Sequence, residues 1–138
     1  MKRKILYVFL ALVIVGVATG LYMWNKPIKH PEDARKIIKI AASDLYKAYS
    51  ADEGKANTLY LAKNNDKALN VSGEVVEVDK NQDGGVLLLL DTGDPIAKVI
   101  CSMRDKTATA QKGQKVKVIG FCTGDDITGV RLTDCIIE

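Results

Sequence analysis

The chain has 138 residues, 47% of them hydrophobic and 27% charged, and its formal net charge at pH 7 is +3. This length allows one domain with a short appendage. The excess charge lies in Lys2, Arg3 and Lys4, whereas the chain from Asn25 onward carries seventeen basic and seventeen acidic residues, which excludes a folded part with the strong positive charge typical of nucleic-acid-binding domains.

The first element is a basic head, residues 1–4, followed by an apolar run that begins at Ile5 and ends at Trp24. These twenty residues contain no charged residue, Pro, Asn or Gln. A helix of this length spans roughly 30 Å, the thickness of a bilayer core. Tyr22 and Trp24 suit the membrane interface. We predict a transmembrane anchor over residues 5–24; the alternative is a signal peptide cleaved near residues 18–20.

Basic residues stand on both sides of this span, so its orientation depends on which signal dominates. Five follow it within the window that matters: Lys26, Lys29, Arg35, Lys36 and Lys39. A plain count favours a cytoplasmic domain, whereas a short basic head before an apolar run is the signal-anchor pattern. We predict a single-pass protein of the inner (cytoplasmic) membrane, with its folded part on the periplasmic or extracellular side.

Residues 25–30 are predicted to form a tether and residues 31–66 a helical segment. Pro31 followed by two acids suits the first turn of a helix, and apolar residues then recur at spacings of three and four. They are Ala34, Ile37, Ile38, Ala41, Leu45 and Ala48. Residues 50–53, from Ser50 to Glu53, resemble a capping box and predict a second helix to about Lys63.

Residues 67–138 contain five strand-like runs separated by turn residues. The runs cover residues 69–78, 86–90, 96–103, 115–122 and 130–137. The apolar face changes within the first run, which predicts a bulge or bend at Gly73 and a long strand shared by both halves of a barrel. The pattern predicts a mainly β fold, a five-stranded Greek-key barrel of the OB type. An open meander is the alternative, but it would leave one apolar face in water.

Short motifs between residues 42 and 138 carry a family resemblance. They include Tyr46 to Ala56, Val71-Ser-Gly-Glu-Val75, Asn81-Gln-Asp-Gly84, Gly120-Phe-Cys-Thr-Gly124 and Leu132-Thr-Asp-Cys135. In order and spacing they resemble the membrane-associated tRNA-anticodon-binding-like (tRNA_anti-like) OB-fold proteins of bacteria. The resemblance implies an OB fold preceded by a helical segment. It implies no particular activity, because a fold hosts many functions.

The charge of the predicted barrel bears on its ligand. From Leu69 onward there are eleven acidic and eight basic residues, and Phe121 is the one aromatic residue. An OB fold that holds single-stranded nucleic acid needs a positive groove and aromatic stacking platforms. We therefore expect a protein or peptide partner, with nucleic acid or oligosaccharide as the alternative. By analogy with the ligand-bearing loops of OB folds, the candidate contact residues are Asn81, Asp83, Thr92, Asp94, Asp125 and Asp126.

Three cysteines allow at most one bridge within the chain. Cys101 and Cys122 share the predicted inward face of their strands, and Cys135 lies in the last strand, which in an OB barrel runs beside the third and fourth. An exported barrel would favour a bridge between any two of them. Three buried thiols that act as small apolar residues are the equal alternative.

Metal binding and catalysis find little support. The one His, His30, lies in the tether, so neither a zinc site nor a catalytic triad can be assembled in the barrel. Residues 79–85 start like an EF-hand loop, but the twelfth position is Leu90, where calcium needs a Glu; we interpret them as a turn. We expect no cofactor, no metal and no enzymatic activity.

Overall fold

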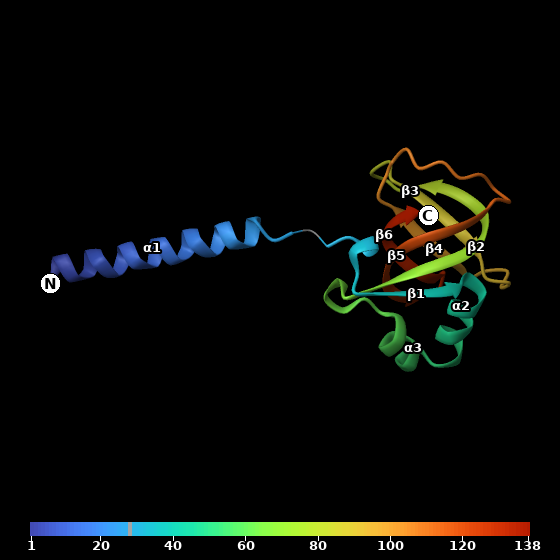
Figure 1. The fold of residues 1–138 in the computed structure, drawn as a ribbon, viewed down its shortest axis with the longest axis horizontal. Coiled ribbons are helices and arrows are strands. Elements are labelled where there is room, and N and C mark those ends of the chain that lie inside the picture. Colours follow the sequence, from blue (N-terminus) through green and yellow to red (C-terminus); the bar gives the residue numbers. More distant parts are fainter. Residues whose placement is uncertain (28) are drawn as a thin grey trace.

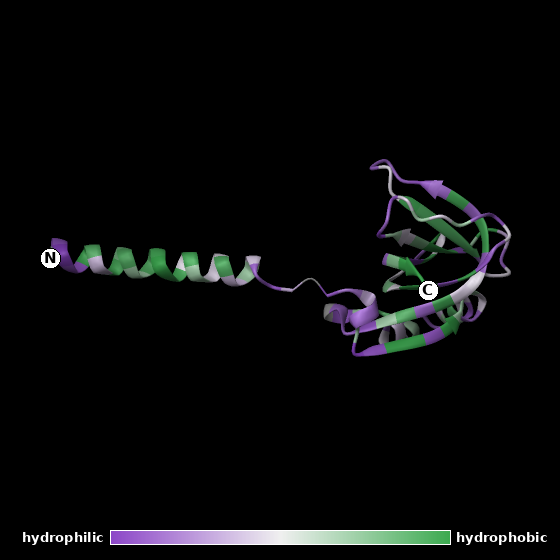
Figure 2. Cartoon of the chain, turned by 45° about the horizontal axis from the view of Figure 1, so that its top comes forward, coloured by the Kyte–Doolittle hydropathy of each residue, from purple (hydrophilic) through white to green (hydrophobic). Residues whose placement is uncertain are grey.

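The computed structural model describes residues 1–27 and 29–138, so Ile28 of the predicted tether lies outside the described residues. Helix α1 (Lys2–Trp24) has no buried residue and stands clear of the folded part (Figure 1). It is apolar along most of its length (Figure 2). Within the described ranges it is the one helix long and apolar enough to cross a membrane.

A closed five-stranded barrel follows, as predicted. Its strands are β2 (Lys67–Lys80), β3 (Val86–Asp91), β4 (Lys98–Met103), β5 (Lys115–Asp126) and β6 (Gly129–Ile137). They follow the order β2-β3-β4-β6-β5, and pairing between β2 and β5 closes the barrel. Strands β4 and β6 pair in parallel and the other barrel pairs are antiparallel, so the open meander is wrong. Strand β5 continues to Asp126, four residues beyond the predicted run at 115–122.

The long first barrel strand, β2, pairs with two other barrel strands. Its first half pairs with β5 and its second half with β3. The predicted bulge exists, but the register shifts between Val75 and Glu77 rather than at Gly73. Gly73 has another role: a Cβ there would lie 3.1 Å from Ala42 Cβ and 3.3 Å from Leu90 Cβ. The missing side chain therefore lets a helix and β3 approach the same point of β2.

The segment before the barrel differs from prediction in its first part. Pro31–Asp33 form one 3₁₀ turn, η1, and the helix predicted to continue from it is wrong, because Lys36–Ala41 form strand β1. This strand pairs in parallel with β2, from Lys36 opposite Lys67 to Ala41 opposite Ser72. Isoleucine favours strands because its branched side chain packs well on a pleated sheet. Ile38 and Ile40 pack on the barrel core at the period of two that a strand requires.

Two helices then lead into the barrel: α2 (Ala42–Ala51) and α3 (Glu53–Tyr60). The N-cap of α3 is Asp52, whose carboxylate accepts a hydrogen bond from Lys55 N–H at 3.0 Å. The capping box predicted at Ser50 is therefore displaced by two residues, because α2 continues through that position. One turn of 3₁₀ helix, η2 (Lys63–Asn65), completes the segment.

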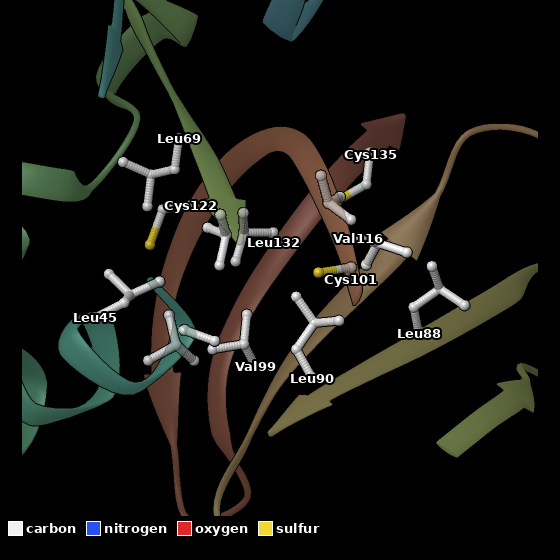
Figure 3. Close-up of a cluster of buried hydrophobic side chains, with 14 of the residues drawn as sticks. Leu45, Leu69, Leu88, Leu90, Val99, Cys101, Val116, Cys122, Leu132 and Cys135 are labelled. Atoms are coloured by element: carbon white, nitrogen blue, oxygen red, sulfur yellow. The ribbon is translucent and has the colours of Figure 1, made fainter. Parts of the chain in front are cut away.

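Helix α2 supplies part of the core. Leu45 is fully buried and Tyr49 is 3% exposed, and both belong to the cluster formed by the inward side chains of all five barrel strands. Figure 3 shows Leu45 pointing into this cluster, opposite Leu90 and Val99. Burying a leucine side chain away from water stabilises the folded state by about 2 kcal/mol. The helix therefore closes one opening of the barrel as a plug.

Candidate functional site

The structure brings four of the six predicted contact residues together. The β3–β4 connection, residues 92–97, lies beside the β5–β6 turn, because Lys98 N–H donates to Thr128 O at 3.0 Å. This places Thr92, Asp94, Asp125 and Asp126 at one end of the barrel, which we call the loop end. The predicted residues Asn81 and Asp83 lie in the β2–β3 turn, at the opposite end of β3.

Hydrogen bonds hold the β3–β4 connection in one shape. Thr92 is 3% exposed, and its hydroxyl donates to Ala97 O at 2.6 Å. Asp94 Oδ1 accepts from Ala97 N–H at 2.9 Å and from Ile96 N–H at 2.8 Å. These two backbone bonds lower the pKa of Asp94, and Tyr46 Oη donates to its other oxygen at 3.4 Å. The connection is therefore a rigid acidic loop.

The β5–β6 turn is built in the same way. Asp126 accepts bonds from the hydroxyl and the backbone N–H of Thr128 and from Arg131. The Thr128 hydroxyl and the Arg131 guanidinium lower the pKa of Asp126 to about 2. In the β2–β3 turn, Asn81 Oδ1 accepts from Asp83 N–H at 3.0 Å. Most of the predicted polar contact residues thus also fix the turn in which they stand.

Two isoleucines project from the loop end into solvent. Ile96 is 77% exposed and Ile127 is 94% exposed, and they stand on the two connections that Lys98 and Thr128 join. Exposed single apolar residues are ordinary. A second apolar surface lies on β3 and β4, beyond the Asp91–Lys98 pair.

That further surface is the outer face of β3 and β4. Leu87, Leu89 and Ile100 are half-buried there, while their neighbours along each strand point into the core. Leu89 and Ile100 are directly opposite each other across the two strands. We call these three residues the apolar stripe. The sequence-based prediction did not include this stripe, although the unbroken apolar run from Val86 to Leu90 indicated it. A strand with one face in water needs an apolar residue only at every second position.

Acidic residues border the stripe. Glu77 and Asp79 are exposed on β2 and pair with Leu89 and Leu87. Within the residues the structure describes, the outward side chains of β3 and β4 include no aromatic ring. Phe121 is 4% exposed and packs in a small second cluster with Ala68 and Ile119. The ring of Phe121 is therefore buried and offers no stacking platform to a base.

All three cysteines are buried free thiols. Cys101 and Cys135 lie on the adjacent strands β4 and β6, and the neighbouring Cys101 thiol, together with burial, raises the pKa of Cys135. Cys122 lies on the far side of the cluster (Figure 3), with its sulfur 3.3 Å from Tyr49 Oη. A disulfide bond within the chain stays a prediction. In this arrangement Cys101 and Cys135 are the pair that could form it.

The chain is similar to a known protein family and to a solved structure. The family model described as tRNA_anti-like matches residues 1–136. Among solved structures, the chain is similar to a crystal structure from Klebsiella pneumoniae of a "putative nucleic acid-binding lipoprotein", with 16% sequence identity, a TM-score of 0.54, and coverage of 72% of this chain and 92% of that chain. At this identity the likeness shows the fold alone. No curated protein sequence matches the chain. The match over almost the whole length, together with the closed OB barrel, shows that the chain belongs to the tRNA_anti-like family.

Proposed function

We propose that this chain is a membrane-anchored, non-catalytic binding module of the bacterial cell envelope, and that its loop end and apolar stripe contact a protein or peptide. The observation that carries the proposal is the character of the outer face of β3 and β4. It presents three half-buried aliphatic side chains, and beyond the Asp91–Lys98 pair the loop end adds two exposed isoleucines. Aliphatic surface of this kind is buried by contact with another polypeptide.

The charges around this surface support the choice of partner. Asp94, Asp125 and Asp126 lie at the loop end, and Glu77 and Asp79 border the stripe. The two nearest cations are already engaged, since Lys98 stands 3.8 Å from Asp91 and Arg131 pairs with Asp126. A phosphate backbone would meet mostly negative charge here, whereas a basic segment of a protein would be attracted.

Membrane placement rests on α1. Its uncharged run from Ile5 to Trp24 has no buried residue, and an exposed apolar helix of this length is stable when lipid surrounds it. The similar Klebsiella pneumoniae structure is described as a lipoprotein, which supports a place at the cell envelope.

A second candidate is binding of single-stranded nucleic acid. It is favoured by the description of the same similar structure as nucleic acid-binding. The two candidates differ in salt dependence, because phosphate contacts release counterions. A fluorescent single-stranded DNA titrated into the full chain in nanodiscs separates them: tight binding that weakens with salt would establish the second candidate and overturn the first.

The proposed contact can be tested by photo-crosslinking in intact cells. A benzoylphenylalanine at position 127 should give one discrete protein adduct, and the same residue at the exposed position 112 should not. Adding Ile96→Asp to the position-127 variant should abolish the adduct, because it places a charge in the apolar contact. Equal adducts from both positions, or adducts removed by nuclease, would contradict a protein contact at the loop end.

A further inference from the structure

The segment that follows the anchor is fastened to the barrel. The Glu32 carboxylate accepts two hydrogen bonds from Arg104, Nη1 to Oε1 at 2.8 Å and Nη2 to Oε2 at 2.9 Å. Arg104 also donates to Asp134, Nε to Oδ1 at 2.7 Å and Nη2 to Oδ2 at 3.0 Å. His30 Nδ1 lies 3.2 Å from Asp134 Oδ2. Pro31, between His30 and Glu32 in the sequence, is fully buried. We call these contacts the clasp.

The clasp shortens the free linker. Between the end of α1 at Trp24 and the clasp at His30, the chain has only residues 25–29. Five extended residues span at most about 18 Å. The side of the barrel that carries the clasp is therefore held within roughly two Debye lengths of a bilayer that α1 crosses. It has little freedom to turn away from that surface.

Basic residues gather on this side. Figure 1 shows the linker reaching the barrel beside the beginnings of β1 and β2, with the β3–β4 connection on the far side. The segments that meet there, residues 25–41 and 61–67, contain seven basic and three acidic residues. One of the three acids, Glu32, is already paired with Arg104. The basic residues, which we call the basic end, are Lys26, Lys29, Arg35, Lys36, Lys39, Lys63 and Lys67.

The pairing of the strands concentrates these charges. Lys36 and Lys67 are directly opposite each other in the parallel β1–β2 ladder. Arg35 precedes the first of them and Lys63 lies in η2, just before the second. Arg35, Lys36 and Lys63 are exposed. The Lys67 ammonium donates to Thr58 O at 3.0 Å and to Leu59 O at 3.3 Å, so the three exposed cations are the ones that an anionic surface would neutralise.

We propose that the basic end seats the barrel on an anionic bilayer surface, with lysine and arginine side chains against the phosphate groups of acidic lipids. The inference rests on the membrane anchoring proposed above. It gives the barrel a polarity: its basic end faces the membrane and its acidic loop end faces away, toward a partner. Nucleic acid would satisfy the same charges, but the five-residue linker keeps this side next to lipid.

Lysine footprinting tests the inference with the full chain in nanodiscs of phosphatidylcholine, with or without phosphatidylglycerol. Acylation of Lys36 and Lys63 should slow about fivefold when the acidic lipid is present, the factor expected for one charge near such a surface. Lys80 and Lys112 are exposed and lie outside the basic end, so their rates serve as internal controls and should not change. The double variant Arg35→Glu, Lys36→Glu should abolish the protection of Lys63, and Lys112→Glu should preserve it.

The outcomes are distinguishable. A chain that does not insert into either nanodisc would overturn the membrane anchoring itself. A chain that inserts but in which Lys36 and Lys63 react as fast as Lys80 and Lys112 in both lipids would overturn the seating and leave the anchoring intact. Protection that is equally strong in neutral lipid would show simple steric cover rather than recognition of phosphate. Protection that arises only when single-stranded DNA is added would assign the basic end to nucleic acid.

Discussion

Replacement of Arg104 by Gln tests how firmly the clasp joins the linker to the barrel. The substitution removes two bidentate ion pairs, with Glu32 and with Asp134. The side chains of the three residues are about one-third exposed, at 32%, 36% and 29%. Solvent screening limits each such pair to about 0.2–1 kcal/mol. For the two pairs together we therefore expect the free energy of unfolding to fall by roughly 0.4–2 kcal/mol.

For a domain of this size the expected loss lowers the midpoint of thermal unfolding by roughly 2–15 °C. The midpoint can be measured by circular dichroism of the full chain in detergent, from the β signal of the barrel. Lys106→Gln is the matched control, because among the described residues the Lys106 ammonium bonds only with Asp83 O, at 3.2 Å. Equal midpoints for the two variants would refute the clasp as a stabilising contact.

The pH dependence provides a second check. The hydrogen bonds from Arg104 lower the pKa of Glu32 from 4.5 to about 2. A carboxyl group whose pKa falls on folding stabilises the folded state above its unfolded pKa, and this stabilisation is lost as pH falls through the folded pKa. The gap between the wild-type chain and Arg104→Gln should be full above about pH 4.5 and shrink toward pH 2. A constant gap would mean that lost packing, not charge, explains the variant.

Three further predictions concern the barrel. Leu45→Ala should cost about 2–5 kcal/mol in urea unfolding, because it opens a cavity under the plug; a loss below about 1 kcal/mol would contradict the burial of Leu45. Gly129→Ala should prevent folding, since a Cβ there would lie 1.8 Å from Lys98 O, whereas Gly93→Ala, also at positive φ, meets nothing within 4 Å; similar expression and melting of both would argue against this close approach. Burial raises the pKa of Cys122, so maleimide should label it only after unfolding, and rapid labelling of the native chain would disprove that burial.

The strands of the barrel were predictable because their signals are local. Most runs alternate at the period of two, Val86 to Leu90 is a short unbroken apolar run, and turn residues such as Gly84 and Gly113 have positive φ. Strand β1 was not predictable in this way. Its isoleucines fit a helical spacing through Ala41 and Leu45 as well as a strand spacing through Ile38 and Ile40. The choice is made by pairing with β2, whose residues lie 31 positions further along the chain, and no local pattern contains that information.

The candidate site was half-predictable for the same reason. Acidic turns are visible in the sequence, but which turns meet depends on the parallel pairing of β4 with β6, which brings Thr128 to Lys98. The clasp had no sequence signal at all. Arg104 is 72 residues from Glu32 and 30 from Asp134, and each of the three looks like an ordinary solvated charge until the fold brings them together.

The parallel pairing of β1 with β2 has a mechanical consequence. A pull on α1 passes through the clasp to the start of β1, and a pull directed along that strand loads the ladder from Lys36 to Ala41 in shear. Its hydrogen bonds must then yield together, whereas a hairpin pulled apart at its open end unzips one bond at a time. The clasp lies before this ladder and takes up the load first. A barrel attached in this way can transmit tension between its two ends without opening.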